Sequence, residues 1–354
     1  MKLTSIIGAR PQFIKVAPLH RELSKWHEHV LIHTGQHYDY EMSKVFFEKL
    51  QIPEPDYNLG IGSGSHGEQT GRMLISIEQV LMKEKPDLVI VYGDTNSTLA
   101  GALAAAKLNL PIAHVEAGLR CYNMKVPEEI NRVLTDHISS IFLCPSSIAI
   151  ENLAREGIER NVHLVGDIMI QCLMEVEDKL SKEYLEKFGI CDREYVLATI
   201  HRQENADVKT RLEAILLALR ECGDTVVLPL HPRTAKYAKL FGLDHLLQTS
   251  ATFRILQPLD FITFASLEKH AKVIVTDSGG VQKEAHYFGV PCITIRNETE
   301  WIETVKEKWN VLVDANKDNI ISAIRNARPG TSKMTRYGDT HVAERIARAI
   351  NIKV

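Results

Sequence analysis

The stretch AKVIVTDSGGVQKEAHYFGVP, residues 271–291, decides the fold class of this chain. Its apolar, β-branched run at 273–275 is typical of a buried parallel strand. The run breaks at 276–280 and resumes as a helical pattern over 281–288, which Gly289 and Pro291 end. A strand, a Gly-Gly turn and a helix start together aim free backbone N–H groups at an anion such as phosphate. A plain strand-to-helix turn without a ligand is the competing interpretation of these residues taken alone.

The same pattern, a short apolar run followed by a helix-compatible stretch, recurs along the whole chain. It predicts an α/β protein with two parallel sheets of similar size. We expect the chain to pass between them at residues 166–167, which gives domains at 1–167 and 168–340. A long helical segment is expected over 168–188, and an amphipathic helix over 341–350 closes the chain. The expected strands are 3–7, 30–33, 88–92, 112–115, 141–143, 162–165, 195–200, 225–230, 253–256, 273–275, 292–295 and 311–313.

Composition excludes several classes of function. Of the 354 residues, 45% are hydrophobic and 25% are charged, as in a soluble globular protein. The net charge of −3 gives no electrostatic reason to expect a nucleic acid or a membrane as partner. The six cysteines lie scattered without a CxxC pair, which argues against a zinc site and fits a reducing cytoplasm. Because no signal sequence or membrane-spanning run is visible either, we expect a cytoplasmic protein.

Polar residues gather directly after the expected strands. Since ligands of open parallel sheets bind beyond the carboxyl ends of the strands, these residues predict one polar crevice between two domains. The alternatives are that Asp94 caps the following helix, that His201 lies in a surface turn, and that Arg10 and Lys15 are solvated charges. Glu116 has no such simple alternative, because a carboxylate next to the core is costly unless it is paired or used. The crevice would receive Arg10, Asp94 and Glu116 from the first domain and His201, Gly279, Gly280 and Arg296 from the second.

The glycine-rich run at 60–67 is superficially similar to a dinucleotide-binding fingerprint. It does not follow a proper strand, so the mechanism of that fingerprint is missing. We interpret the run as a loop ahead of a helix over 69–83, one that could close over a ligand. A nicotinamide cofactor is therefore not expected.

Six motifs in a fixed order identify a family. They are IGARPQFIK, VYGDTNSTLAGALAA, HVEAGLR followed by PEEINR, TIHRQEN and TDSGGVQKEA. Together they resemble the non-hydrolysing UDP-N-acetylglucosamine 2-epimerases over almost the whole chain. The resemblance implies two Rossmann-like domains facing a cleft, as in GT-B glycosyltransferases. It also implies that the C-terminal helix, 341–354, packs back on the first domain, and that the protein is a homodimer.

The resemblance also implies a reaction that needs no cofactor and no metal. The C2 proton of a UDP-2-acetamido sugar is removed while UDP leaves C1, and UDP then adds back to the 2-acetamidoglucal with protonation on the other face of C2. Such chemistry needs acid and base groups on two faces, donors for the departing UDP, and exclusion of water. The main expectation is conversion of UDP-GlcNAc to UDP-ManNAc, which supplies sugars for surface polysaccharide or glycoprotein glycans.

Matching positions carry the family's roles into this chain. Asp94, Glu116 and Glu128 match the catalytic carboxylates, and His201 matches the catalytic-site histidine. Substrate and UDP would be bound by Arg10, Lys15, Arg132, Leu259 through its backbone, Phe264, Ser278, Gly279, Gly280 and Glu284, together with Arg296. Some bacterial members bind a second UDP-GlcNAc as an activator, and Gln36, His37 and Arg72 lie where such a site would be.

Two departures leave the sugar open. Arg233 follows His231-Pro232 where the family usually has Asn, and Trp301 replaces an arginine of the family's Thr-Glu-Arg-Pro-Glu stretch. These features resemble the branch that includes UDP-2,3-diacetamido-2,3-dideoxyglucuronate 2-epimerases, whose uronate would need an extra cation from Arg233 or Arg296. The remaining alternatives are a GT-B glycosyltransferase that uses a UDP-sugar, a hydrolysing epimerase and a non-catalytic nucleotide-sugar sensor.

Overall fold

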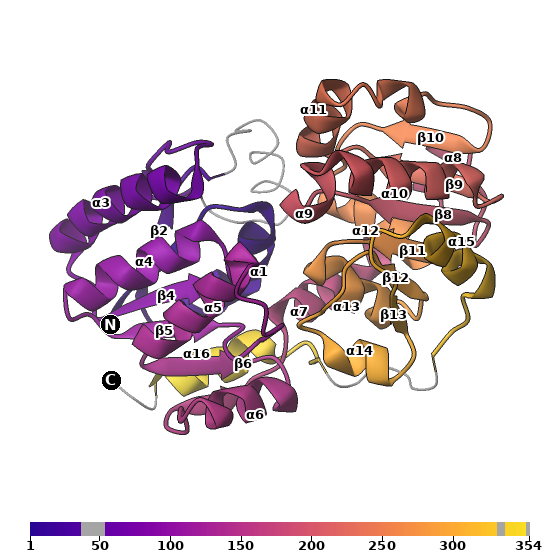
Figure 1. Ribbon diagram of the computed structural model, residues 1–354. Coiled ribbons are helices and arrows are strands. Elements are labelled where there is room, and N and C mark those ends of the chain that lie inside the picture. Colours follow the sequence, from indigo (N-terminus) through magenta and orange to yellow (C-terminus); the bar gives the residue numbers. More distant parts are fainter. Residues whose placement is uncertain (37–53, 331–336, 352–354) are drawn as a thin grey trace. The chain divides into compact units, whose positions relative to one another are not determined.

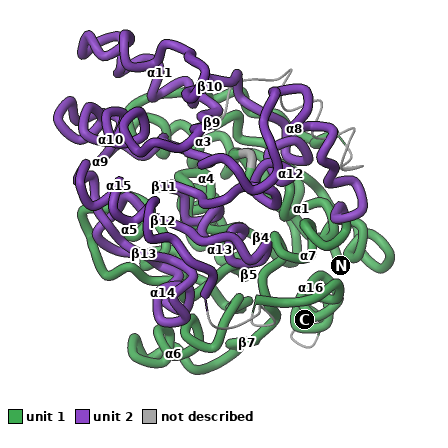
Figure 2. Tube along the Cα trace, turned by 90° about the vertical axis from the view of Figure 1, so that its right-hand side faces the viewer, with its two compact units in different colours: residues 1–175, 335–354 green, residues 176–334 purple. Residues whose placement is uncertain are grey.

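The computed structural model of the protein describes residues 1–36, 54–330 and 337–351 (Figure 1). The chain divides into two compact units, coloured separately in Figure 2. The first unit consists of Met1–Glu175 and Thr335–Val354, and the second of Val176–Met334. The chain therefore leaves the first unit once and returns to it at the end.

The first unit is built on a seven-stranded sheet in the order β3-β2-β1-β4-β5-β6-β7, and every pair of neighbours is parallel. The apolar runs of the sequence form these strands because both faces of the sheet are covered. The side chains of β4, LVIVY, illustrate this, since all five are fully buried. The strands are β1 (Lys2–Ile7), β2 (Glu28–His33), β3 (Tyr57–Asn58), β4 (Leu88–Tyr92), β5 (Ile112–Val115), β6 (Ile141–Cys144) and β7 (Val162–Leu164).

Helices cover both faces of this sheet because the strand order reverses between β1 and β4, and crossovers between parallel strands are right-handed in nearly all proteins. Helices α3, α4 and α5 pack side by side, and α1, α7 and α16 pack against one another. The Ala-rich α4 lies so close to the sheet that a Cβ on Gly101 would be 2.7 Å from a methyl group of Ile6. The helices are α1 (Arg10–Leu23), α3 (His66–Glu84), α4 (Asn96–Lys107), α5 (Pro127–Ile138), α6 (Ser147–Arg155), α7 (Ile168–Glu175) and α16 (Val342–Asn351).

The second unit repeats this plan with a six-stranded parallel sheet in the order β10-β9-β8-β11-β12-β13. Here the strand order reverses between β8 and β11 (Figure 1). The strands are β8 (Tyr195–Thr199), β9 (Thr225–Pro229), β10 (Phe253–Leu256), β11 (Val273–Thr276), β12 (Cys292–Thr294) and β13 (Asn310–Leu312). The helices are η1 (Glu177–Lys179), α8 (Glu183–Lys187), α9 (Gln203–Ala206), α10 (Lys209–Glu221), α11 (Pro232–Leu240), η2 (Asp244–Leu247), α12 (Phe261–His270), α13 (Gly279–Tyr287), α14 (Ile302–Lys306) and α15 (Lys317–Asn326).

The predicted α/β class with two Rossmann-like parallel-sheet domains is confirmed, but one predicted helix is wrong. The segment 168–188 is not continuous, since α7, η1 and α8 follow one another there. The reason is that α7 packs against α1 of the first unit, whereas Leu185 of α8 is buried in a core of the second. Consequently the chain enters the second unit after α7, whereas the sequence places the change before it.

Helix α3 begins at His66, ahead of the predicted 69, because the side chain of Ser65 caps it by accepting a hydrogen bond from the Glu68 amide. The glycine-rich loop is correspondingly shorter than predicted. Among the helices that the structure describes, none is both long enough and apolar enough to cross a membrane.

Candidate functional site

In the first unit, the carboxyl ends of β1 and β4 are tied together by the side chain of Gln12. Its Oε1 accepts hydrogen bonds from the amides of Gly8 (2.8 Å) and Ala9 (3.0 Å), and its Nε2 donates to the carbonyl of Tyr92 (2.8 Å). These are the neighbouring strands between which the order reverses, and ligands bind at such points in open α/β sheets. Gln12 is not among the site residues predicted from the sequence, although it lies within the IGARPQFIK motif.

The turn after β4 leaves room for the predicted carboxylate of Glu116 next to the backbone that leads into Asp94. Gly93 has φ +63, and a Cβ there would be 3.1 Å from Oε2 of Glu116 and 3.4 Å from Nζ of Lys15. Only glycine leaves room for this pair against the backbone that leads directly into Asp94. The turn thus places the Glu116 carboxylate next to the segment that carries Asp94.

Asp94 does not cap the helix that follows it, so the simpler interpretation of this residue is wrong. Thr95 is the N-cap of α4, and its side chain accepts from the amide of Thr98. The Asp94 carboxylate is instead 2.7 Å from Nη1 of Arg132, and its side chain is 31% exposed. A carboxylate that is both cation-bound and open to solvent is suited to contact a ligand.

Glu116 occupies an unusual backbone conformation, with φ +70 directly after β5. A left-handed conformation costs a non-glycine residue about 1–2 kcal/mol, and such strain gathers at functional sites. Glu116 is 7% exposed, and its side chain pairs with Lys15 of α1, which is buried as well. The interpretation of Lys15 as a solvated charge is therefore wrong.

Helix α5 supplies the remaining groups of this cluster. Arg132 is 1% exposed and forms ion pairs with two carboxylates. Its Nη1 lies 2.7 Å from Asp94, and its Nη2 lies 2.7 Å from Glu129. Glu128 lies one turn before Arg132, in the first turn of the same helix, and is half-buried. We refer to Lys15, Asp94, Glu116 and Arg132 as the first-unit cluster. Ion pairs join Lys15 to Glu116 and Arg132 to Asp94, and the first pair lies next to Gly93, which directly precedes Asp94. Glu128 shares helix α5 with Arg132.

The residues assigned to a second UDP-GlcNAc are not joined in the same way. Oε1 of Gln36 accepts from the amide (3.1 Å) and hydroxyl (2.6 Å) of Ser97 at the start of α4. Arg72 is exposed on α3 and pairs with Glu68 at 3.6 Å. His37 and the side chain of Arg10 lie outside what the structure describes. The activator site therefore stays a prediction.

In the second unit, a buried carboxylate anchors the predicted histidine. Asp277, which follows β11, accepts from the amide of His201 (3.0 Å) and lies 2.9 Å from its Nδ1. Burial alone would raise the pKa of Asp277, but the His201 charge and several hydrogen bonds hold that pKa well below its usual value. Because Nδ1 faces Asp277, the Nε2 edge of the ring is left for a ligand, and the side chain is 38% exposed. Asp277 thus fixes the position of His201, which does not fit the interpretation of this residue as part of a loose surface turn.

Helix α13 begins at Gly279, two residues before the predicted 281, because the side chain of Ser278 caps it by accepting a hydrogen bond from the Val281 amide. Gly279 and Gly280 therefore belong to the first turn of the helix and not to the turn before it. A Cβ on Gly279 would collide with the carboxylate of Glu300, so that carboxylate lies directly against the helix start. Glu300 in turn is 3.0 Å from Nη1 of Arg296, a fully buried residue that follows β12. Negative charge at a helix N-terminus is stabilised by the backbone, which makes this a place for exchangeable anions.

Arg296 has more hydrogen-bonding capacity than its surroundings use. Its Nε and Nη2 are buried and have no hydrogen-bond partner among the described residues, and the nearest further carboxylate, Glu204, is 3.7 Å from Nε. A buried guanidinium that lacks hydrogen-bond partners lowers the stability of the fold, unless a ligand accepts its hydrogen bonds. We refer to His201, Asp277, Ser278, Gly279, Gly280 and Arg296 as the second-unit cluster.

The other predicted UDP contacts lie on α12 and α13. Glu284 is buried one turn into α13, beside the fully buried Glu268 of α12. Burial, together with the charge and hydrogen bond of Glu284, raises the pKa of Glu268 well above its usual value. Leu259 and Phe264 are partly buried against the core of this unit. No group of three or more His, Cys, Asp or Glu side chains within the described ranges is placed to hold a metal ion.

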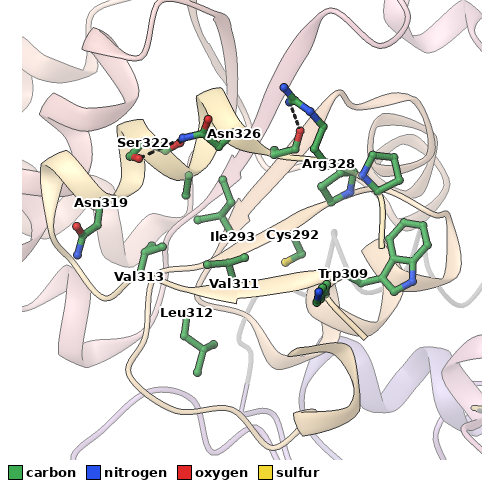
Figure 3. Close-up of a pocket in the computed structure, with 15 residues that line it drawn as sticks. Cys292, Ile293, Trp309, Val311, Leu312, Val313, Asn319, Ser322, Asn326 and Arg328 are labelled. Atoms are coloured by element: carbon green, nitrogen blue, oxygen red, sulfur yellow. Dashed lines mark hydrogen bonds between the residues drawn. The ribbon is translucent and has the colours of Figure 1, made fainter. Parts of the chain in front are cut away.

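A pocket of about 480 Å³ lies elsewhere in the second unit, between β12, β13 and α15 (Figure 3). Its walls are mainly apolar, with Trp309, Val311 and Ile293 among them, and Asn326 in its lining bonds to Ser322 at 2.9 Å. It contains no residue of the second-unit cluster. We conclude that this pocket is separate from the predicted site.

Comparison with known proteins identifies relatives over the full length of the chain. A family model described as UDP-N-acetylglucosamine 2-epimerase matches residues 21–351. A UDP-N-acetylglucosamine 2-epimerase homolog of Methanococcus maripaludis is 49% identical over 354 residues, which is 99% of each chain. The UDP-2,3-diacetamido-2,3-dideoxy-D-glucuronate 2-epimerase of Pseudomonas aeruginosa is 46% identical over 98% of each chain.

A solved structure agrees with these relatives. The crystal structure of Methanocaldococcus jannaschii UDP-GlcNAc 2-epimerase in complex with UDP-GlcNAc and UDP has a TM-score of 0.94 to this chain and 45% sequence identity. The match covers 99% of this chain and 100% of that one.

Proposed function

Because the chain belongs to the UDP-N-acetylglucosamine 2-epimerase family, we propose that it inverts C2 of a UDP-2-acetamido sugar without hydrolysing it. Epimerases are isomerases, so the protein is an isomerase. The main substrate we propose is UDP-GlcNAc, converted to UDP-ManNAc. The first unit would carry the acid and base groups, and the second would hold UDP.

The observation that carries this proposal is the pair of carboxylates at the end of β4 and β5. Gly93 lets Glu116 lie against the backbone of Asp94, and each carboxylate has its own cation, Lys15 and Arg132. Inversion at C2 requires one group to remove a proton and another to deliver one on the opposite face. Two carboxylates on separate strand ends, each fixed by a different cation, supply such a pair.

We propose that one of Asp94 and Glu116 removes the C2 proton while the C1–O bond to UDP breaks and its electrons leave with UDP. The product of this step is a 2-acetamidoglucal. In the second step UDP adds back to C1, and the other carboxyl group, which enters the cycle protonated, delivers its proton to C2 on the opposite face. Both groups then exchange protons with solvent and return to their starting states, so no atom is gained or lost. Glu128, at the start of α5, would support the second proton transfer.

The second-unit cluster suits a diphosphate. Two nitrogens of Arg296, Nε and Nη2, are buried without a hydrogen-bond partner among the described residues. Through Glu300 this guanidinium lies next to the N-terminus of α13. His201, fixed by Asp277, presents its Nε2 edge and would assist the departure of UDP. Charge on the leaving group is stabilised best by donors that are already in place. Glu284 would bind the ribose, and Leu259 and Phe264 the uracil.

Exchange at C2 tests the proposal directly. The protein is incubated with UDP-GlcNAc in D₂O and followed by NMR, and we expect deuterium at C2 of a sugar that still carries UDP. Asp94→Asn and Glu116→Gln should each abolish turnover and leave UDP affinity unchanged. Asp87→Asn, at an exposed carboxylate that accepts from the amide of Lys2, is the matched control. Absence of exchange with every UDP-2-acetamido sugar supplied would refute the proposed function.

A diacetamido uronate is the second candidate substrate, and one observation favours it. The uronate needs an additional cation, and the two candidates from the sequence differ in the structure. Arg233 is held by both carboxylate oxygens of Asp207, at 2.7 and 2.9 Å, whereas Arg296 retains unused donors. Because the diphosphate that we also assign to Arg296 is common to both substrates, Arg296→Gln should reduce turnover of both, and a larger loss on the uronate measures the additional contact with its carboxylate. Equal losses on both substrates would argue against this candidate.

We also propose that the protein is a homodimer. Helices α3 and α5 expose Ile75 (58%), Met82 (51%), Ile130 (37%) and Leu134 (46%), and apolar surface of this kind is typical of interfaces. Light scattering should give twice the mass of one chain, and Leu134→Glu should shift the protein toward the monomer. Leu240→Glu, at a residue of the second unit that is 69% exposed, should not. A wild-type monomer would refute the proposal.

A further inference from the structure

One fully buried histidine of the first unit has no part in the chemistry described so far. His114 lies in β5, two residues before Glu116, and is 0% exposed. Its Nδ1 is 2.6 Å from Oδ1 of Asp136, and its Nε2 is 2.7 Å from the carbonyl oxygen of Gly93. A carboxylate and a carbonyl both accept, so each ring nitrogen must donate. Both nitrogens of His114 therefore carry a hydrogen.

Asp136 of α5 is the centre of the network that holds His114. Besides the histidine, it accepts from the amide of Gly118 (3.1 Å) and from Nη1 of Arg120 (2.7 Å). Burial alone would raise the pKa of Asp136, but the charges and hydrogen bonds of His114 and Arg120 hold it below its usual value. Asp136 is thus a buried carboxylate with all of its partners cationic or backbone donors, which is the arrangement that stabilises buried charge.

The groups that this network binds are the backbone on either side of the predicted catalytic residues. Gly93, whose carbonyl accepts from His114, directly precedes Asp94. Gly118, whose amide donates to Asp136, follows Glu116 by two residues, and His114 precedes Glu116 by two. The strained φ +70 of Glu116 is therefore enclosed between two fixed points.

The same pair also fixes the helix that carries the third carboxylate. Glu128, Arg132 and Asp136 are spaced by four residues on α5 and so share one face of that helix. Arg132 on this face reaches Asp94, and Asp136 reaches His114 in the neighbouring strand. A displacement of Asp136 would move the start of α5, with Glu128, relative to the strand ends.

We propose that His114 and Asp136 are positioning residues for the epimerisation, which together hold the backbone turns of Asp94 and Glu116 and the helix of Glu128 in register. The inference rests on the proposed function, because it assigns a role only if these carboxylates transfer the protons. Catalytic groups must be held within fractions of an ångström, and a misplacement of about 1 Å costs roughly 100-fold in rate.

Two substitutions of His114 each keep one of its two hydrogen bonds and remove the other. In His114→Asn, the side-chain amide can replace Nδ1 and reach Asp136 but not Gly93. In His114→Gln, the amide can replace Nε2 and reach the Gly93 carbonyl but not Asp136. We expect each to lower kcat by roughly 10- to 100-fold while KM and the Kd for UDP stay within about two-fold of the wild type. A residue needed only for folding would lower the amount of active enzyme, which also lowers the apparent kcat at unchanged KM. The kcat is therefore referred to the sites counted by UDP titration, and per UDP-binding site a purely structural substitution would leave it unchanged.

Glu156→Gln is the matched control for loss of a buried charge contact nearby. Glu156 binds Nε and Nη2 of Arg120 at 2.7 Å from the partly exposed side of the network, and it contacts neither His114 nor Gly118. This variant should keep its kcat even if it unfolds at a lower temperature. A loss of kcat equal to that of the His114 variants would contradict a specific positioning role.

A measurement on the wild type keeps the proposal testable if the variants do not fold. In ¹⁵N-histidine NMR at neutral pH, His114 should show hydrogens on both ring nitrogens, and Asp136→Asn should remove that signature. A neutral His114 tautomer in the wild type, or unchanged kcat in both His114 variants, would overturn the proposal. If the wild type epimerises no UDP-sugar, the proposed function fails instead, and the NMR result still decides whether the network exists.

Discussion

Separating the buried ion pair of Lys15 and Glu116 should destabilise the first unit by an amount that can be calculated in advance. Both residues are 7% exposed, so removal of either charge leaves the other inside the protein without compensation. Breaking such a pair typically costs 3–5 kcal/mol, and we expect about 3 kcal/mol here, because the flexible stem of a lysine lets its charge relax toward solvent. Glu116→Gln and Lys15→Met should each have this effect.

The double variant is the decisive one. Replacing both charges at once leaves no uncompensated ion, and Met fills the volume of the lysine stem, so Lys15→Met combined with Glu116→Gln should be less destabilised than either single variant. The comparison removes effects of either substitution that have nothing to do with the pair.

Native-state hydrogen exchange measures this effect within one unit of the chain. A loss of about 3 kcal/mol should accelerate exchange of the most protected amides of β4 and β5 by about 100-fold. Amides of β8 belong to the second unit and serve as an internal reference. The reasoning is refuted if the single variants exchange like the wild type, or if the double variant exchanges faster than both of them.

Two further predictions concern acid stability and the glycine turn. Burial, and then the charges of two neighbouring histidines, lower the pKa of His29 to about 3 in the folded protein. In the unfolded chain this histidine binds a proton already near pH 6.5, so the free energy of unfolding decreases as the pH falls from about 6.5 toward 3. We expect a loss of about 1 kcal/mol by pH 5, after discounting for partial exposure, and thermal unfolding of His29→Gln should lack it; parallel pH curves for the two proteins would contradict this. Gly93→Ala should lose about 1 kcal/mol through backbone strain and also lower kcat roughly 10-fold, because its Cβ would crowd the Glu116 carboxylate at 3.1 Å. Gly157→Ala, at φ +79 with nothing within 4 Å of a Cβ, should show the strain alone, and an equal loss of kcat there would contradict the crowding argument.

The strands were predictable from the sequence because each is a compact apolar run that both faces of a sheet bury. Residues 88–92, 112–115 and 253–256 are strands over the predicted bounds. The short edge strand β3, with only Tyr57 and Asn58, was missed because two residues carry no periodicity. The candidate site was predictable to the extent that polar residues follow strands, which is how Asp94, Glu116 and His201 were identified.

The partners of these residues could not be predicted in the same way. Asp277 anchors His201 from another strand, and Asp136 reaches His114 from a helix, so both contacts depend on the folded topology and not on spacing in the sequence. Local propensity also gives no sign that Glu116 adopts a left-handed conformation, which glycine or asparagine would adopt more readily. The choice of which cation faces which carboxylate is decided by packing, as the burial of Lys15 shows.

The return of the chain to its first unit has a consequence for how the protein is made. Val342, Ile346 and Ile350 of α16 are fully buried, and the amide of Ala343 donates to Oε1 of Gln171 in α7 at 2.8 Å. A ribosome synthesises this helix only after it has synthesised the whole second unit. We therefore expect the second unit to complete its core during synthesis, whereas the first unit, although translated earlier, finishes only when α16 emerges. A nascent chain that stalls before α16 would expose the apolar surface of α1 and α7 to chaperones.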